Sequence, residues 1–247
     1  MARVLGEAAR YVTGQSLKKY KRQLLTIVLV SCFFSFGLGL FISLGLNKQP
    51  LSLITFLVFI AAIPVIAILT NKATDKLERE RIKFRKGAAG EELVGYILKG
   101  FPEDYVVIYG VETRFGDIDH IVVGPSGVYA IDTKNWRGVV TADGKGELLL
   151  NGKPTNKPAI RNLIRAIMTI KDEIKFHSTF SPYIHALLVF PAARVEAKWG
   201  QTESVHCVRA DQLYEYIIEK KKGKGLNKKE MDAISQAFLA VARKDRH

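Results

Sequence analysis

The stretch of sequence that decides the fold runs from residue 87 to residue 138. It reads G-A-A-G-E-E-L-V at 87–94, G-D-I-D-H-I-V-V-G at 116–124 and V-Y-A-I-D-T-K-N-W-R-G at 128–138. The first segment has helical spacing, and the other two contain apolar runs of strand length. Their charged residues include three acids and one lysine whose spacing is typical of a metal-dependent phosphodiester-hydrolysing site.

The segment G-P-S-G at 124–127 separates the two apolar runs and predicts a hairpin. A two-residue loop would place Asp119 opposite Asp132 and Asp117 opposite Lys134. The proline of this segment cannot take a positive φ, which favours instead a type I turn with a glycine bulge at Gly127, and such a turn shifts the pairing by one residue. Two facing carboxylates repel each other, so the first register calls for a divalent cation held by oxygen ligands.

Glu91 is the third acid, and helical spacing decides where it points. On a helix it shares one face with Gly87, Gly90, Val94 and Leu98, whereas Glu92 falls on another face. We therefore expect Glu91 to face the sheet. The two glycines would let the helix backbone approach the strands closely.

These motifs together resemble the nuclease-related domain, or NERD, family, which is similar to restriction endonucleases. The resemblance covers roughly residues 87–190 and implies an α/β fold with a restriction-endonuclease-like αβββαβ core. Carried over by position, it implies catalytic roles for Glu91, Asp119, Asp132 and Lys134. The chain departs from the family pattern at Asp132, where glutamate is common, and at Arg161, which occupies the place of a usual glutamine.

The resemblance also implies a cofactor and a substrate. Mg²⁺ or Mn²⁺ would be held by Asp119, Asp132 and the Thr133 carbonyl, with Glu91 as a direct or water-mediated ligand. Lys134 would orient or deprotonate the attacking water and offset phosphate charge. The expected substrate is nucleic acid, with DNA favoured over RNA.

Two apolar runs near the N-terminus are each long enough to cross a bilayer. Residues 24–46 and 51–70 contain no charged side chain, and roughly 20 apolar residues span a hydrocarbon core. Basic residues exceed acidic ones in both flanks, by five over residues 1–23 and by four over residues 72–86. The sequence therefore predicts a transmembrane helical hairpin in the cell membrane, with both termini and the catalytic domain cytoplasmic.

The net charge of +13 does not by itself indicate a nucleic-acid-binding surface. Residues 87–219 have a net charge of −3, so the excess lies in the membrane flanks and in residues 220–247. A local substrate track is conceivable along a few basic residues, although a solvated face explains each of them equally simply. These are Arg114, Arg137, Lys153, Lys157, Arg161 and Arg165.

The sequence predicts that the chain is divided into five parts. They are a basic segment (1–23), the transmembrane hairpin (24–71), a charged helical connector (72–86), the nuclease-like domain (87–208), and C-terminal helices with a basic tail (209–247). Within the domain, strands are expected at 105–109, 139–141, 147–150, 183–190 and 204–208, besides the two acid-bearing strands. Isoleucines and leucines from 160 to 174 recur at helical spacing after Pro158.

Two functions from different classes fit these observations. One is a membrane-anchored, metal-dependent nuclease. The other is a catalytically inactive module that keeps the fold and binds nucleic acid or assembles partners at the membrane. A transporter or channel is excluded, because neither apolar run carries an ionisable side chain.

Overall fold

The computed structural model describes residues 1–5, 27–28, 30–43, 45–46, 51–113, 115–197, 205–219 and 225–244. The chain divides into two compact units, one made of residues 1–9 and 86–247 and the other of residues 10–85. The predicted loop at 47–50, the lysine cluster at 220–224 and Arg114 lie outside the described residues.

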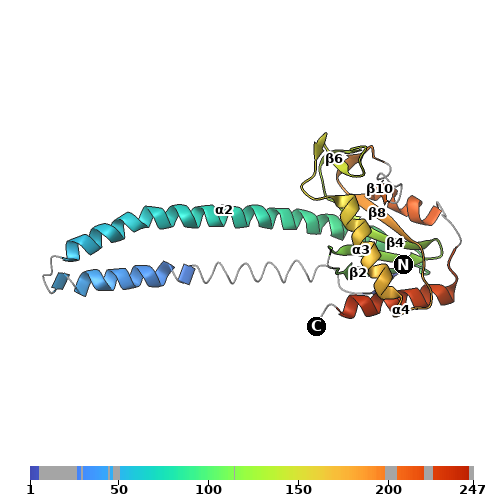
Figure 1. The fold of residues 1–247 in the computed structure, drawn as a ribbon, viewed down its shortest axis with the longest axis horizontal. Coiled ribbons are helices and arrows are strands. Elements are labelled where there is room, and N and C mark those ends of the chain that lie inside the picture. The colour runs from blue at the N-terminus through green and yellow to red at the C-terminus, as the bar shows by residue number, and fades with distance from the viewer. Residues whose placement is uncertain are drawn as a thin grey trace. The chain divides into compact units, whose positions relative to one another are not determined.

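The first unit is built on a six-stranded mixed sheet (Figure 1). Its strand order is β1-β2-β3-β4-β8-β10, in which β2, β3 and β4 are antiparallel and the other neighbours are parallel. The strands are β1 (Arg3–Leu5), β2 (Val106–Val111), β3 (Ile118–Gly124), β4 (Gly127–Thr133), β8 (Ile184–Phe190) and β10 (Val205–Arg209). With the helices described below, the order αβββαβ is confirmed, and the mixed α/β model is consistent with a restriction-endonuclease-like core.

Helices cover both faces of this sheet. The C-terminal part of α2 (Leu51–Lys99) packs Val94 and Leu98 on one face, together with the segment that follows β10. On the other face lie α3 (Ala159–Ile174) and α4 (Lys228–Lys244), whose apolar side chains share one core cluster with the strands. The first of the expected C-terminal helices begins as a 3-10 turn (Ala210–Gln212) and ends as a short π-helix (Glu215–Glu219).

A second sheet of four short strands is inserted beside the core. Its order is β7-β6-β5-β9, formed by β5 (Gly138–Ala142), β6 (Leu148–Leu150), β7 (Lys153–Pro154) and β9 (Ala193–Val195). The turn expected at Asn151-Gly152 is confirmed, since both residues have a positive φ, of 52° and 73°. β9 carries no signal in the sequence, because three residues are too few to show a period.

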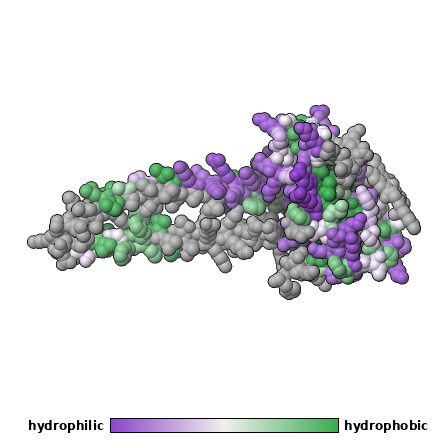
Figure 2. Space-filling view, viewed as in Figure 1, coloured by the Kyte–Doolittle hydropathy of each residue, from purple (hydrophilic) through white to green (hydrophobic). Residues whose placement is uncertain are grey.

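α2 is one continuous helix of 49 residues. The helical connector expected at 72–86 therefore continues without a break through Gly87 into the helix that carries Glu91. Each glycine costs about 1 kcal/mol relative to alanine in a helix, and the packing of Val94 and Leu98 outweighs that cost. Among the described side chains of α2, hydrophobic residues give way to hydrophilic ones in the direction of its C-terminus (Figure 2). None of the helices in the described part of the chain combines the length and apolar character needed to cross a bilayer.

The N-terminal strand β1 was not predicted, because the sequence analysis treated residues 1–23 only as a basic segment. Arg3, Val4 and Leu5 pair in parallel with Val106, Val107 and Ile108. The Ala2 N–H donates to the Lys99 carbonyl at 3.3 Å, and the Arg3 N–H donates to the Tyr105 carbonyl at 2.9 Å. The first residues of the chain therefore form an edge of the same sheet that carries the acids.

Candidate active site

The β3–β4 hairpin has the register expected from a two-residue loop. Gly124 pairs with Gly127, and the ladder continues to His120 opposite Ile131, so the next positions are Asp119 and Asp132. The alternative register, shifted by one residue, is wrong. The turn avoids a positive φ at Pro125 and takes it at Gly127, where φ is 132°. Pro125 and Ser126 thus form the loop.

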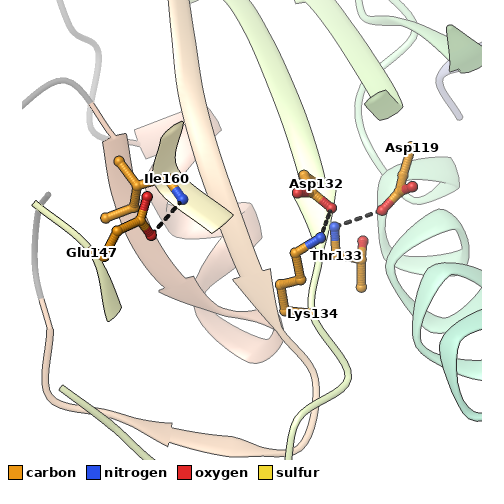
Figure 3. Close-up of polar contacts among 6 residues, drawn as sticks. All are labelled: Asp119, Asp132, Thr133, Lys134, Glu147 and Ile160. Atoms are coloured by element: carbon orange, nitrogen blue, oxygen red, sulfur yellow. Dashed lines mark hydrogen bonds and ion pairs between the residues drawn. The ribbon is translucent and has the colours of Figure 1, made fainter. Parts of the chain in front are cut away.

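Different contacts hold the carboxylates of Asp119 and Asp132 at the end of the hairpin (Figure 3). The Thr133 backbone N–H donates to Oδ2 of Asp119 at 2.6 Å. Oδ1 of Asp132 accepts a hydrogen bond from Nζ of Lys134 at 2.7 Å, within an ion pair. The strand pairing and one backbone contact therefore fix both carboxylates within the same small region.

Lys134 follows β4 directly and is held by its own backbone. Its N–H donates to the Val189 carbonyl of β8 at 2.8 Å, so the side chain leaves the sheet at a defined point. The expectation that Asp117 lies opposite Lys134 is not met by the ladder, which ends before these residues because β3 begins at Ile118 and β4 ends at Thr133. Asp117 is exposed, and Lys134 pairs with Asp132 instead.

Glu91 lies on the predicted face of α2. Val94 and Leu98 on that face are buried and Glu91 is half-buried, whereas Glu92 is exposed. Only one of the two predicted glycines allows close approach. A Cβ at Gly90 would lie 2.7 Å from Cβ of Asn135, whereas a Cβ at Gly87 would meet nothing within 4 Å.

Asn135 is a positioning residue that the sequence analysis missed. Its Nδ2 donates to the Lys86 carbonyl at 2.6 Å and so ties the residue after Lys134 to the helix that carries Glu91. No short-range pattern could have revealed this bond, because 49 positions separate its partners.

Burial raises the pKa of all three carboxyl groups, and repulsion by neighbouring carboxylates adds to the rise for Asp119 and Glu91. For Asp119, burial is the largest cause, followed by the charges of Asp132 and Glu91, and the pKa lies well above the usual 3.8. Burial also raises the pKa of Glu91, with further contributions from Asp132 and Asp117. Burial raises the pKa of Asp132 as well, although the Lys134 ammonium opposes the rise. These shifts describe one acidic cluster that a single lysine leaves incompletely neutralised.

The pKa of Lys134 is raised, despite burial that acts to lower it. The negative charges of Asp132, Asp119 and Glu91 outweigh the burial. Lys134 is therefore an ammonium ion at neutral pH in this arrangement. In this state Lys134 can donate hydrogen bonds and supply positive charge. It can act as a general base only when a bound cation offsets the carboxylate charges that raise its pKa.

The described side chains contain no group of three or more His, Cys, Asp or Glu residues positioned to hold a metal ion. The donor chemistry nevertheless suits a hard cation, because carboxylate oxygens are the ligands that Mg²⁺ prefers and their charges here are uncompensated. The ligand roles of Asp119, Asp132, Glu91 and the Thr133 carbonyl remain predictions.

Two neighbouring residues have packing roles. His120 points away from Asp119 as expected, is buried against Tyr109 with ring centroids 4.9 Å apart, and has its pKa lowered to about 4 by burial. It is therefore neutral at physiological pH. The Trp136 ring packs against the Phe190 ring, with centroids 5.5 Å apart.

Arg161 and the helix that carries it are positioned by Glu147. Oε2 of Glu147 accepts the Ile160 N–H at 3.2 Å, and Oε1 accepts the Arg161 N–H at 2.9 Å. Figure 3 shows this contact to one side of the Asp119 and Asp132 carboxylates. The Arg161 side chain is exposed. Glu147 thus acts as a distant cap for α3, whose N-terminus has no side-chain cap from Pro158.

Comparison with known proteins agrees with this site. Residues 86–191 match the model of the nuclease-related domain, NERD. An uncharacterized protein of Bacillus anthracis, pXO1-01/BXA0003/GBAA_pXO1_0003, is 36% identical over 83 residues, which cover 31% of this chain and 39% of that protein. The match therefore spans well under half of the relative's length. No solved structure matches the chain. The matched region contains the whole acidic cluster, Lys134 and α3.

Proposed function

We propose that this protein is a metal-dependent nuclease that hydrolyses phosphodiester bonds. The observation that carries the proposal is the convergence of Glu91, Asp119 and Asp132, whose pKa values are all raised by burial, around a charged Lys134. Groups with strongly shifted pKa values concentrate at catalytic sites. The match of residues 86–191 to a nuclease-related domain supports this reaction class.

The acidic cluster suits Mg²⁺ or Mn²⁺, which Asp119 and Asp132 would hold with the Thr133 carbonyl and with Glu91. A bound ion of this kind polarises a phosphoryl oxygen and lowers the pKa of bound water. The protein's own contribution is orientation. The Thr133 N–H fixes Asp119, and Asp132 holds the Lys134 ammonium at 2.7 Å. That ammonium can donate to the attacking water and offset the negative charge of the transition state.

Nucleic acid is the proposed substrate, with DNA ahead of RNA because the motif set is similar to that of restriction endonucleases. The test is incubation of the full chain with single-stranded and double-stranded DNA and RNA, with Mg²⁺, with Mn²⁺ and with EDTA. Cleavage that requires the metal is expected. Absence of cleavage on all four substrates would refute the nuclease proposal.

Lys134→Ala separates catalysis from binding. We expect cleavage to fall by about 100-fold or more, because the ammonium acts mainly in the transition state, while equilibrium binding measured with Ca²⁺ changes little. Lys145→Ala is the matched control, since the Lys145 side chain is exposed on a turn of the second sheet.

The alternative is a non-catalytic nucleic-acid-binding module, which the internal Asp132–Lys134 ion pair also permits. In that case Lys134 is one phosphate contact among several. Its loss would weaken binding modestly and flatten the salt dependence by about one unit of slope. This alternative would be established if the wild type cleaves none of the substrates and Lys134→Ala binds them more weakly than the wild type.

We further propose that residues 24–46 and 51–70 anchor the domain in the cell membrane with both termini cytoplasmic. Besides the charge pattern, the second unit exposes many large apolar side chains, as expected of a surface that meets lipid. Among them are Ile27, Val28, Phe33, Phe36, Leu38, Leu40, Ile42, Leu57, Val58, Ile60 and Ile68. A reporter that is active only outside the cytoplasm should be silent when fused after His247 and active when inserted at 47–50. The reverse pattern would overturn this topology.

A further inference from the structure

An exposed aromatic ring lies in the loop between β2 and β3. Phe115 is 40% exposed, yet its turn is closed by hydrogen bonds. Oγ1 of Thr113 accepts the Phe115 N–H at 3.2 Å and donates to the Gly116 carbonyl at 2.5 Å, and the Gly116 N–H donates to the Thr113 carbonyl at 3.2 Å. Gly116 has a φ of 129°, which favours glycine. The turn therefore presents the ring from a defined backbone.

The Arg165 guanidinium lies over this ring, with Cζ 5.7 Å from the ring centroid. That distance is within the range of a cation–π interaction. Arg165 is exposed on α3, and Arg161 is exposed one turn earlier on the same side of the helix. An aromatic surface and positive charge thus lie together, although the domain as a whole is acidic.

This pair lies on the face of the sheet toward which Asp119 points, opposite the face that α2 covers. Asp119 shares a strand face with Ile121 and Val123, and these two side chains pack in the same core cluster as the buried residues of α3. Asp119 follows Phe115 by only four residues, and β3 begins at Ile118 between them. The β2–β3 loop therefore leads directly from the exposed ring to the acidic cluster.

We propose that Phe115 and Arg165 form a binding site for one unpaired nucleotide beside the acidic cluster, with the base stacked on Phe115 and a neighbouring phosphate on Arg165. Stacking on an aromatic side chain tolerates any base and is a feature of single-strand binding. In a duplex the faces of the bases are occupied by their neighbours, so this site selects single-stranded or frayed nucleic acid. The inference rests on the proposed function, since it names the substrate form that the same site takes.

The simpler explanation is that Arg165 and Phe115 only fasten α3 to the loop. The two explanations differ in whether the base matters. A fastening role predicts that loss of the ring affects stability, or affects all nucleic acids equally. A stacking role predicts an effect that requires a base next to the phosphate.

The experiment measures equilibrium binding of the detergent-purified full chain, with Ca²⁺ in place of Mg²⁺. Three labelled probes of equal length are compared, namely a thymidine single strand, the same strand without bases, and its duplex. For the wild type we expect the base-bearing single strand to bind more tightly than both other probes. Phe115→Ala should weaken binding of the base-bearing single strand by about 5- to 100-fold and leave binding of the abasic strand unchanged. Phe115→Trp should retain tight binding of the base-bearing strand. Phe176→Ala is the matched control, because Phe176 is 85% exposed just beyond α3.

Equal binding of the base-bearing and abasic strands by the wild type would overturn the inference, and so would equal weakening of both in Phe115→Ala. Hydrolysis of a small phosphodiester without bases, bis(4-nitrophenyl) phosphate, tests the proposed function separately. Phe115→Ala should cleave it at the wild-type rate with Mn²⁺. If the wild type does not cleave bis(4-nitrophenyl) phosphate but binds the base-bearing strand more tightly than the abasic strand, the nuclease proposal fails and the stacking site stands. If the wild type cleaves this phosphodiester but binds both strands equally, the nuclease proposal stands and the stacking site fails.

Discussion

The close approach of α2 to the active-site strand can be tested with one pair of glycines. Gly90 and Gly87 lie one turn apart on the same helix, and replacing either by alanine raises helix propensity by about 1 kcal/mol. Their surroundings differ. A Cβ at Gly90 would be 2.7 Å from Cβ and 3.0 Å from Cγ of Asn135, whereas a Cβ at Gly87 has nothing within 4 Å.

The magnitude follows from this contrast. Cβ of Asn135 cannot rotate away, so Gly90→Ala must move either the helix or the strand, and overpacking of this kind costs about 1 to 3 kcal/mol. Subtracting the propensity gain leaves a destabilisation of about 0 to 2 kcal/mol. Gly87→Ala should instead stabilise the protein by up to about 1 kcal/mol. The gap between the two variants, about 1 to 3 kcal/mol, isolates the clash from the helix propensity.

The same clash has a functional consequence, because it lies between Glu91 and the Asn135 bond to Lys86. We expect Gly90→Ala to lower metal-dependent cleavage at least tenfold through misplacement of the carboxylate, and Gly87→Ala to leave it unchanged. The assays are urea unfolding of both variants and cleavage of the same oligonucleotide. Equal stability and equal activity of the two variants would refute the close approach as the reason for glycine at position 90.

Three further predictions concern the acids and the cysteine. The pKa of Asp119 is raised above 3.8 mainly by burial, so the metal-free protein should lose stability as pH rises from about 4 through the folded-state pKa. In thermal melts with EDTA, Asp119→Asn should flatten this dependence of Tm on pH. If the wild type and the variant lose stability in parallel, the raised pKa of Asp119 is contradicted. Glu147→Ala removes the acceptor of two α3 N–H groups and should cost about 1 to 2 kcal/mol in urea unfolding, while Glu173→Ala on the same helix should cost far less. Burial raises the pKa of the Cys207 thiol to about 12. In a Cys32→Ser background, iodoacetamide at pH 8 should therefore label Cys207 slowly until denaturant is added. Labelling at the rate of a free cysteine would show that the thiol is accessible.

Local patterns in the sequence predicted the centre of the site. The segment at 124–127 predicted the hairpin but left two registers open, and the proline favoured the shifted one, which the strand pairing shows to be wrong. The orientation of Glu91 followed from helical spacing, because Val94 and Leu98 had to be buried. Helix 159–174 followed from its isoleucine spacing. In each case the determining residues lie within a few positions of one another.

The features that the sequence did not reveal depend on contacts between distant positions. The Asn135 bond to Lys86 joins residues 49 positions apart, and the Glu147 cap of α3 joins residues 13 and 14 positions apart. Polar side chains such as these have many possible partners, and nothing in their neighbours selects one. The charge of Lys134 is a similar case, since it is set by three carboxylates that only the fold brings together.

The strand β1 bears directly on the membrane prediction, although it lies outside both apolar runs. Arg3, Val4 and Leu5 are hydrogen-bonded in one ladder with β2, so the start of the chain and the domain from residue 86 onward occupy the same compartment. If the chain between them crosses a bilayer, it does so an even number of times. A single crossing, in which only one of the runs 24–46 and 51–70 spans the membrane, would pull β1 away from β2. The proposed hairpin meets this condition, and the positive flanks predict that both ends are cytoplasmic. A fragment that begins at residue 87 would also lose this edge strand, so nuclease assays require the full chain.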